Sequence, residues 1–150
     1  KEELKEFNEE FRHIYKTKYL MEAEIYPGIK DLLACLSDQK FMAVATNKRI
    51  DYTLVLMDGL DLSKYFDIIE GSDFEGRLGK SDLIGRCMEM SGFLPSETVV
   101  IGDTISDALA AKECGSDFIG VTYGFGFKKP EDVPLGIGIK SVSSLYDMLL

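Results

Sequence analysis

Residues 99–115, VVIGDTISDALAAKECG, decide the fold. The stretch begins as an apolar run, passes through Gly102 and Asp103, and continues with small and apolar residues at helical spacing as far as Gly115. An apolar run that leads directly into a helix is typical of a parallel α/β sheet. Asp103 and Asp107 are four residues apart at this junction, so we expect both carboxylates to face the same space above the sheet.

The same alternation of apolar runs and helical patterns extends along the rest of the chain. Apolar runs predict strands at residues 41–46, 66–73, 97–103 and 117–124. Helical spacing predicts helices at residues 4–15, 25–38, 47–60, 80–92, 104–115 and 141–150. The run FMAVAT, residues 41–46, is continuously apolar and predicts a strand buried on both faces. The expected fold class is therefore α/β, with a Rossmann-like parallel sheet flanked by helices.

The composition limits the partners and compartments that the chain can have. Its 150 residues are 45% hydrophobic, which is enough for a sizeable core. A net charge of −9 argues against binding to nucleic acid or to an anionic membrane surface. Cys35, Cys87 and Cys114 are far apart and odd in number, which indicates reduced thiols in a cytoplasmic protein. We expect a monomer or a homodimer.

Three polar clusters follow expected strands, where the sites of open parallel sheets lie. Thr46 and Asn47 form either an anion cradle or a plain helix cap. Lys80 starts a helix, where the dipole disfavours a cation, so it is either a solvated lysine or the partner of an anion. Asp103 and Asp107 repel one another unless a cation lies between them, and Mg²⁺ suits a pair of carboxylates. Alternatively, Asp107 is only a favourable first-turn residue.

In this order, the clusters resemble the motifs of the haloacid dehalogenase-like hydrolase superfamily. VATNK, residues 44–48, resembles the second motif, and GKSDLI, residues 79–84, resembles the third. Residues 99–115 resemble the fourth motif, which is the most specific of the series. GVTYGFG, residues 120–126, further resembles the members that are like phosphoglycolate phosphatase.

The resemblance covers nearly the whole chain and implies a division into two parts. IYPGIKDLL, residues 25–33, looks like the return from a helical cap into the core. Residues 1–22 would then be the remnant of that cap. Residues 23–150 would be the α/β core of the family without its first strand.

The resemblance also implies a Mg²⁺-dependent phosphomonoester hydrolase that acts on a small phosphorylated metabolite through an aspartyl-phosphate intermediate. Thr46 would hydrogen-bond the transferred phosphoryl group, with Asn47 shaping the same cradle. Lys80 would neutralise phosphoryl charge and orient the nucleophile. Asp103 would bind Mg²⁺ directly, and Asp107 would bind the ion or its water shell. These roles agree with phosphoryl transfer, in which positioning and charge stabilisation dominate.

The first motif of the family, DxDxT after an N-terminal strand, does not occur in the sequence. By resemblance this motif supplies the nucleophile, so we expect the 150 residues alone to be inactive. The strand that carries it would lie mid-sheet, between the strand before Thr46 and the strand before Asp103. We therefore expect either that these residues are an excerpt of a longer chain or that another segment fills the gap.

Other functions remain open at this stage. A sugar-phosphate mutase of the same fold would pass the phosphoryl group between hydroxyls. A non-catalytic phosphate-binding or regulatory module would keep the fold without the nucleophile, although the intact cluster of Thr46, Lys80, Asp103 and Asp107 argues against it. A receiver domain would place its lysine after its last acidic residue, whereas Lys80 precedes Asp103.

One further segment, VTYGFGFKKPEDVP at residues 121–134, follows the last long expected strand. It is either a loop that flanks the mouth of the site or a packed surface loop whose glycines allow tight turns. We expect Lys128 and Lys129 to be solvated.

Overall fold

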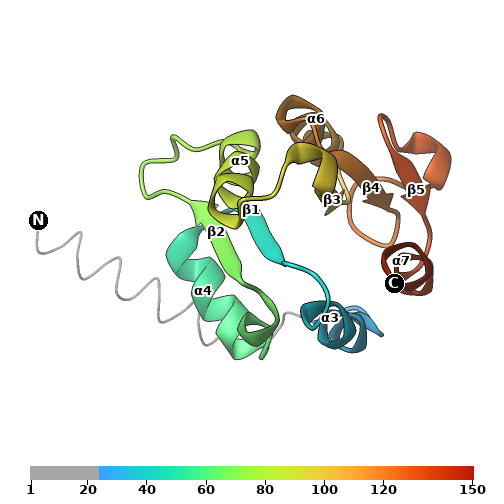
Figure 1. Ribbon diagram of the computed structural model, residues 1–150, viewed down its shortest axis with the longest axis horizontal. Coiled ribbons are helices and arrows are strands. Elements are labelled where there is room, and N and C mark those ends of the chain that lie inside the picture. The colour runs from blue at the N-terminus through green and yellow to red at the C-terminus, as the bar shows by residue number, and fades with distance from the viewer. Residues whose placement is uncertain (1–23) are drawn as a thin grey trace, which may run out of the picture.

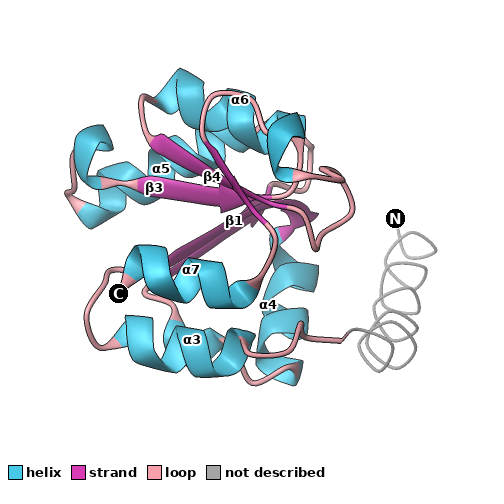
Figure 2. Ribbon diagram, turned by 90° about the vertical axis from the view of Figure 1, so that its right-hand side faces the viewer, coloured by secondary structure: helices cyan, strands magenta, loops and turns pink. Residues whose placement is uncertain are grey.

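The computed structural model describes residues 24–150. The expected cap remnant at residues 1–22 and the helix at 4–15 therefore lie outside the described residues. The described part is a three-layer α/β structure, with strands in the middle and helices on both sides (Figure 1, Figure 2). The expected α/β class with parallel strands is confirmed. None of the described helices has the length and apolar character to cross a membrane.

Helices and strands alternate along the chain as the hydrophobic pattern predicts. The helices are α3 (Ile29–Ser37), α4 (Ile50–Gly59), α5 (Lys80–Ser91), α6 (Ile105–Cys114) and α7 (Val142–Leu149). The strands are β1 (Ala43–Arg49), β2 (Ile68–Ser72), β3 (Val99–Gly102), β4 (Asp117–Val121) and β5 (Ile137–Ile139). Left-handed glycines end α5 and α6 at Gly92 and Gly115, where a side chain would be strained.

The strands form two parallel sheets rather than one. β1 pairs with β2, and β3, β4 and β5 pair in that order. The register places Thr46 opposite Gly71 in the first sheet and Gly102 opposite Gly120 in the second. Within residues 24–150 no strand pairs with the edges of β1 and β3 that face each other.

The expectation that residues 41–46 form a strand buried on both faces is wrong. Ala43 is exposed, and Val44 and Ala45 are only partly buried. The physical reason is the pairing, because β1 has a strand neighbour on one side alone. The same cause leaves the apolar side chains of Val99 and Ile101 in β3 exposed.

The α5 and α6 layer packs against both sheets and holds them together. Ile84 and Met88 of α5 and Ala110 of α6 form a buried cluster, against which Ala45 of β1 and Val100 of β3 pack. The run of small residues in α6 allows this close approach, since Ala108 and Ala111 are completely buried. The opposite layer is α3 and α7, which pack on β4 and β5 through Leu32, Leu36, Leu145, Ile119, Val121 and Ile139.

Three local details differ from the sequence pattern. The expected helix at 25–38 begins only at Ile29, so Pro27 precedes the Gly28 cap and lies outside the first turn. The expected helix at 47–60 begins only at Ile50, because residues 47–49 continue β1. β5 was not expected, since a strand of three residues between turns is too short to show alternation.

Candidate active site

Lys80 connects the two sheets at their carboxyl edge. Its Nζ donates to the carbonyl oxygen of Ala45 in β1 at 3.1 Å. The same Nζ lies 3.2 Å from Oδ1 of Asp107 in α6, and the two side chains are only 18% and 12% exposed. Lys80 is the first residue of α5, so the nearby carboxylate compensates for the unfavourable helix dipole.

Asp107 is held by donors on several sides. Its Oδ2 accepts the backbone N–H of Asp103 at 3.1 Å and that of Thr104 at 3.3 Å, and the Thr104 hydroxyl accepts the N–H of Asp107 in return. Burial by itself would raise the pKa of Asp107, but the charge of Lys80 and the hydrogen bonds together hold the pKa below its usual value. The carboxylate is therefore ionised at neutral pH.

Gly102 makes room for this arrangement. A Cβ at position 102 would lie 2.5 Å from the Cβ and Oδ2 of Asp107. The glycine of the sequence pattern GDTISD is thus required by the close approach of the Asp107 side chain to the end of β3.

Asp103 follows β3 directly and is partly exposed. Its Oδ2 accepts the backbone N–H of Phe125 at 2.8 Å, and its carbonyl oxygen accepts the N–H of Phe127 at 2.9 Å. Within the described part of the chain, Oδ1 of Asp103 has no hydrogen-bond partner. The protein therefore holds one of the two carboxylate oxygens of Asp103.

Thr46 and Asn47 lie at the irregular end of β1. The pairing of β1 with β2 shifts between Thr46 and Arg49, and the Thr46 hydroxyl accepts the N–H of Lys48 at 3.2 Å. Asn47 is exposed. The alternative that these two residues cap the next helix is wrong, because the N-cap of α4 is Arg49.

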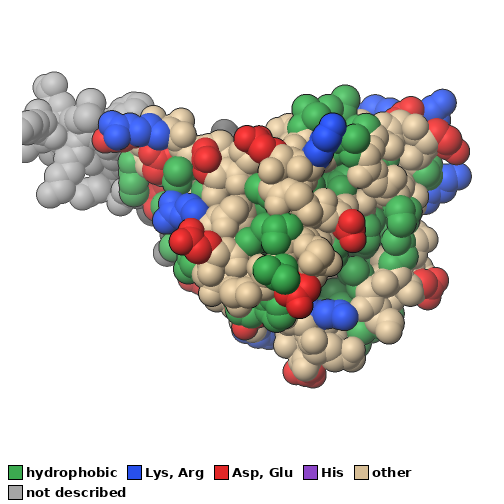
Figure 3. Space-filling model, turned by 45° about the horizontal axis from the view of Figure 1, so that its top comes forward, with side chains coloured by type: hydrophobic (Ala, Val, Ile, Leu, Met, Phe, Trp, Pro, Cys, Tyr) green, Lys and Arg blue, Asp and Glu red, His purple; other side chains and the backbone are tan. Residues whose placement is uncertain are grey.

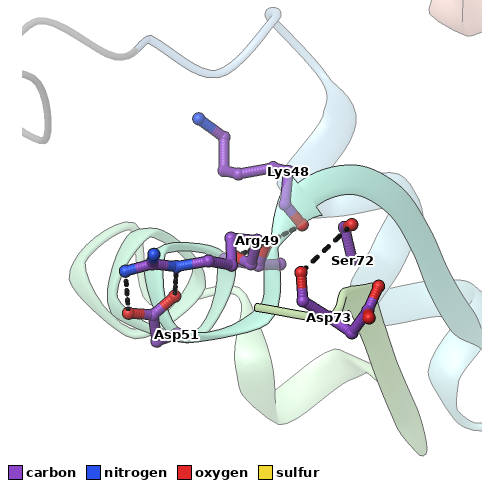
Figure 4. A network of polar contacts seen from close by, with 6 residues as sticks. Lys48, Arg49, Asp51, Ser72 and Asp73 are labelled. Atoms are coloured by element: carbon purple, nitrogen blue, oxygen red, sulfur yellow. Dashed lines mark hydrogen bonds and ion pairs between the residues drawn. The ribbon is translucent and has the colours of Figure 1, made fainter. Parts of the chain in front are cut away.

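A polar network that the sequence pattern did not reveal fixes the turn after Thr46 (Figure 4). Arg49 donates through Nε and Nη2 to both carboxylate oxygens of Asp51, at 2.7 and 2.9 Å. Its guanidinium also lies 4.4 Å from the ring centre of Tyr52 and 4.7 Å from that of Phe74. A pair separated by two residues has no distinctive sequence signal.

The neighbouring end of β2 closes against this turn. Gly71 is buried, and a Cβ there would lie 2.7 Å from the carbonyl oxygen of Lys48 and 2.8 Å from Cα of Ile50. The Thr53 hydroxyl donates to the carbonyl oxygens of Lys48 and Arg49. The backbone after Thr46 is consequently held from both sides.

The donor set fits Mg²⁺ in part. This ion takes one or two carboxylates and keeps several waters, and Asp103 offers a carboxylate oxygen without a protein partner. Both oxygens of Asp107 already have partners, which suits contact with the water shell of an ion. In residues 24–150 no group of three or more acidic, histidine or cysteine side chains is placed to form a cage, so most ligands would be water or substrate.

The loop beyond β4 lies beside these residues. Lys128 and Lys129 are exposed, as expected. A depression of about 400 Å³ lies between this loop and the start of α6, lined by Thr104, Ile105, Ser106, Gly126, Phe127, Lys128 and Asp132. None of Thr46, Lys80, Asp103 and Asp107 lines it, so the depression adjoins the candidate site without containing it.

Taken together, the fold and the site define a parallel α/β protein with a lysine and two aspartates at the carboxyl edge of its strands. The sequence profile of the haloacid dehalogenase-like hydrolases matches residues 1–121. The chain belongs to this family.

Individual proteins agree with this assignment. The chain is 34% identical over 108 residues to a probable phosphoglycolate phosphatase of Pseudomonas putida, which covers 71% of this chain and 43% of that protein. The crystal structure of a predicted phosphatase from Clostridium acetobutylicum has a TM-score of 0.84 and 32% identity, covering 93% of this chain and 66% of that one. A haloacid dehalogenase-like hydrolase from Streptococcus pneumoniae has a TM-score of 0.78 and 30% identity, covering 99% and 71%. The chain thus spans less than half the length of the curated relative.

Proposed function

We propose that the protein carrying this chain is a Mg²⁺-dependent phosphatase that hydrolyses a small phosphate monoester. The observation that carries the proposal is the contact of Lys80 with both β1 and Asp107, beside the Asp103 carboxylate. A cation and a metal-binding carboxylate at one edge provide the charge stabilisation on which phosphoryl transfer depends. The similarity to phosphoglycolate phosphatases supports a small anionic substrate.

The side chains have distinct roles in this proposal. Lys80 binds a phosphoryl oxygen through its ammonium, and the Thr46 hydroxyl and the backbone after it hydrogen-bond the same group. Asn47 borders this cradle. Asp103 holds Mg²⁺, and Asp107 contacts the ion through water while keeping Lys80 in place. When bound, the ion supplies positive charge that offsets the charge of the phosphoryl oxygens.

The nucleophile comes from outside the 150 residues in this proposal. A further strand lies between β1 and β3 and carries an aspartate at its carboxyl end, close to Lys80. Its carboxylate oxygen attacks phosphorus while the P–O bond to the ester oxygen breaks, and a general acid, also outside the 150 residues, gives that oxygen a proton. Water, which returns a proton to the same group, then attacks the aspartyl-phosphate to release inorganic phosphate and the free carboxylate. The two unpaired edges that face each other support a strand at this place.

A phosphatase assay on the complete natural protein tests the proposal. We expect Mg²⁺-dependent release of phosphate from a generic aryl phosphate such as p-nitrophenyl phosphate. Lys80→Ala should lower kcat/KM by about 10²–10³-fold, the usual loss when a group that stabilises transition-state charge is removed.

Lys128→Ala is the matched control, because it removes the same charge from an exposed position. It should retain most of the activity. Near-normal rates in Lys80→Ala would remove Lys80 from the mechanism, and no turnover with any divalent metal would favour a binding or regulatory module.

A further inference from the structure

The segment Thr122–Phe127, TYGFGF, wraps around Asp103. Two backbone N–H groups of this segment donate hydrogen bonds to Asp103. The N–H of Phe125 donates to Oδ2 of Asp103 at 2.8 Å, and the N–H of Phe127 donates to the carbonyl oxygen of Asp103 at 2.9 Å. One loop therefore holds both the side chain and the main chain of Asp103. Phe125, which makes the first contact, lies 22 residues after Asp103 in the sequence.

Two glycines allow the loop to approach so closely. A Cβ at Gly124 would lie 2.4 Å from the Cβ and Oδ2 of Asp103, and a Cβ at Gly126 would lie 2.0 Å from its carbonyl oxygen. Neither glycine has a positive φ. The requirement at both positions is thus space around Asp103 and not an unusual backbone conformation.

The loop is anchored by the buried side chain of Phe127. Phe127 is 4% exposed and packs with Ala108, Ala111 and Phe118, whose ring centre lies 6.3 Å away. The Phe125 side chain is 90% exposed, so this residue contributes its backbone N–H to the contact and not its ring. A buried phenylalanine thus fixes the N–H two residues before it.

We propose that the segment Thr122–Phe127 is a positioning element for a divalent cation, which holds Oδ2 of Asp103 and thereby presents Oδ1 to the ion. The inference rests on the proposed function, because it takes Asp103 as the metal ligand. It adds a role for the loop, which supplies no ligand but determines the orientation of one. Outer partners of this kind change metal affinity by about 10–100-fold when they are removed.

The test measures Mn²⁺ binding to the complete natural protein by electron paramagnetic resonance, which counts unbound Mn²⁺ and does not depend on turnover. Gly124→Ala places a methyl group against the Cβ and the carboxylate of Asp103, so it must displace that side chain from its present position. We expect it to weaken Mn²⁺ binding by about 10–100-fold, with an unchanged circular dichroism spectrum.

Gly85→Ala is the matched control, since a Cβ at that position in α5 meets nothing within 4 Å. It should bind Mn²⁺ as the natural protein does. Asp103→Asn separates the two proposals. If it leaves Mn²⁺ binding intact, the metal site of the proposed function is wrong. If it weakens binding while Gly124→Ala binds normally, only the positioning role is overturned.

A second measurement covers the case in which Gly124→Ala fails to fold. Hydrogen exchange of the Phe125 amide in the natural protein reports directly on the contact with Oδ2. Positioning requires a protected amide whose NMR shift changes when Mg²⁺ is added. An amide that exchanges freely and does not respond to Mg²⁺ would overturn the inference.

Discussion

Asp107 keeps its carboxylate among Lys80 and two backbone N–H groups, and this makes stability depend on pH. Burial opposes ionisation, yet the net pKa is lowered in the folded state. A carboxyl group with a lowered pKa stabilises the fold at pH values above its unfolded pKa. That contribution is lost as the pH falls through the folded pKa.

We therefore expect Asp107→Asn to destabilise the protein at pH 7 by about 1–3 kcal/mol, because the ammonium of Lys80 loses its carboxylate. The difference should shrink toward pH 3. Urea unfolding at several pH values measures it. Asp38→Asn, at an exposed position, is the control and should have little effect. A destabilisation that stays constant between pH 7 and pH 3 would contradict the role of the charge.

At the residue scale, the sequence predicted which side chains belong to the candidate site, but it did not predict most of the contacts between them. The order of Thr46, Lys80, Asp103 and Asp107 predicted that they share one edge, and the structure brings Lys80 and Asp107 into contact. Their catalytic roles stay predictions. The Phe125 contact could not be foreseen, because a backbone N–H carries no residue identity. Only the glycines on either side of it were a signal.

At the element scale, the N-terminus of α6 has two tasks. The Thr104 side chain caps the helix by accepting the N–H of Asp107, and the Asp107 side chain returns a bond to the N–H of Thr104. Ser141 caps α7 in the same way by accepting the N–H of Ser144. Both caps use the same kind of side-chain hydrogen bond, but only the cap of α6 also involves Asp107.

We expect Thr104→Ala and Ser141→Ala each to lower stability by about 0.5–2 kcal/mol, the usual cost of losing a cap. Only Thr104→Ala should also lower kcat/KM and Mg²⁺ affinity in the complete protein, since it loosens Asp107. Thermal unfolding and steady-state kinetics on both variants make the comparison. Equal effects on kinetics would show that the cap of α6 has no special link to the site.

Element types could be predicted from periodicity, but some boundaries could not. The start of α4 was placed too early because Asn47, Lys48 and Arg49 are compatible with a helix by composition. In the structure these residues extend β1, where tertiary contacts such as that of Gly71 with the Lys48 backbone decide the conformation. β5 could not be predicted, because its three residues form a strand only by pairing with β4, which lies well before it in the sequence.

At the scale of the whole molecule, the main feature is the separation of the strands into two sheets. A strand between β1 and β3 would contribute several hydrogen bonds of about 0.5–1.5 kcal/mol each, besides covering apolar side chains such as Val99 and Ile101. This is comparable with the total stability of a domain, about 5–15 kcal/mol. Apolar side chains of the described residues also reach the surface elsewhere (Figure 3).

We expect hydrogen exchange in the 150-residue chain to reveal this separation. β4 pairs on both sides, so its amides should exchange slowest. Those amides of β1 and β3 that face each other should exchange on the order of tenfold faster or more. NMR-detected exchange measures both sets in one sample. In the complete protein the difference should disappear, and equal protection in the 150-residue chain would contradict the open edge.

The position of Lys80 gives this separation a consequence at atomic scale. One ammonium group bonds to Ala45 in the first sheet and to Asp107 beside the second, at 3.1 and 3.2 Å. The hydrogen bond to Ala45 weakens once the separation of its sheet from Asp107 grows by about half an ångström, since hydrogen bonds weaken quickly beyond about 3.5 Å. Lys80 can therefore contact Ala45 and Asp107 together only within a narrow range of distances between the two sheets. Any change that moves β1 away from β3 would weaken one of these contacts and shift the ammonium charge on which the site depends.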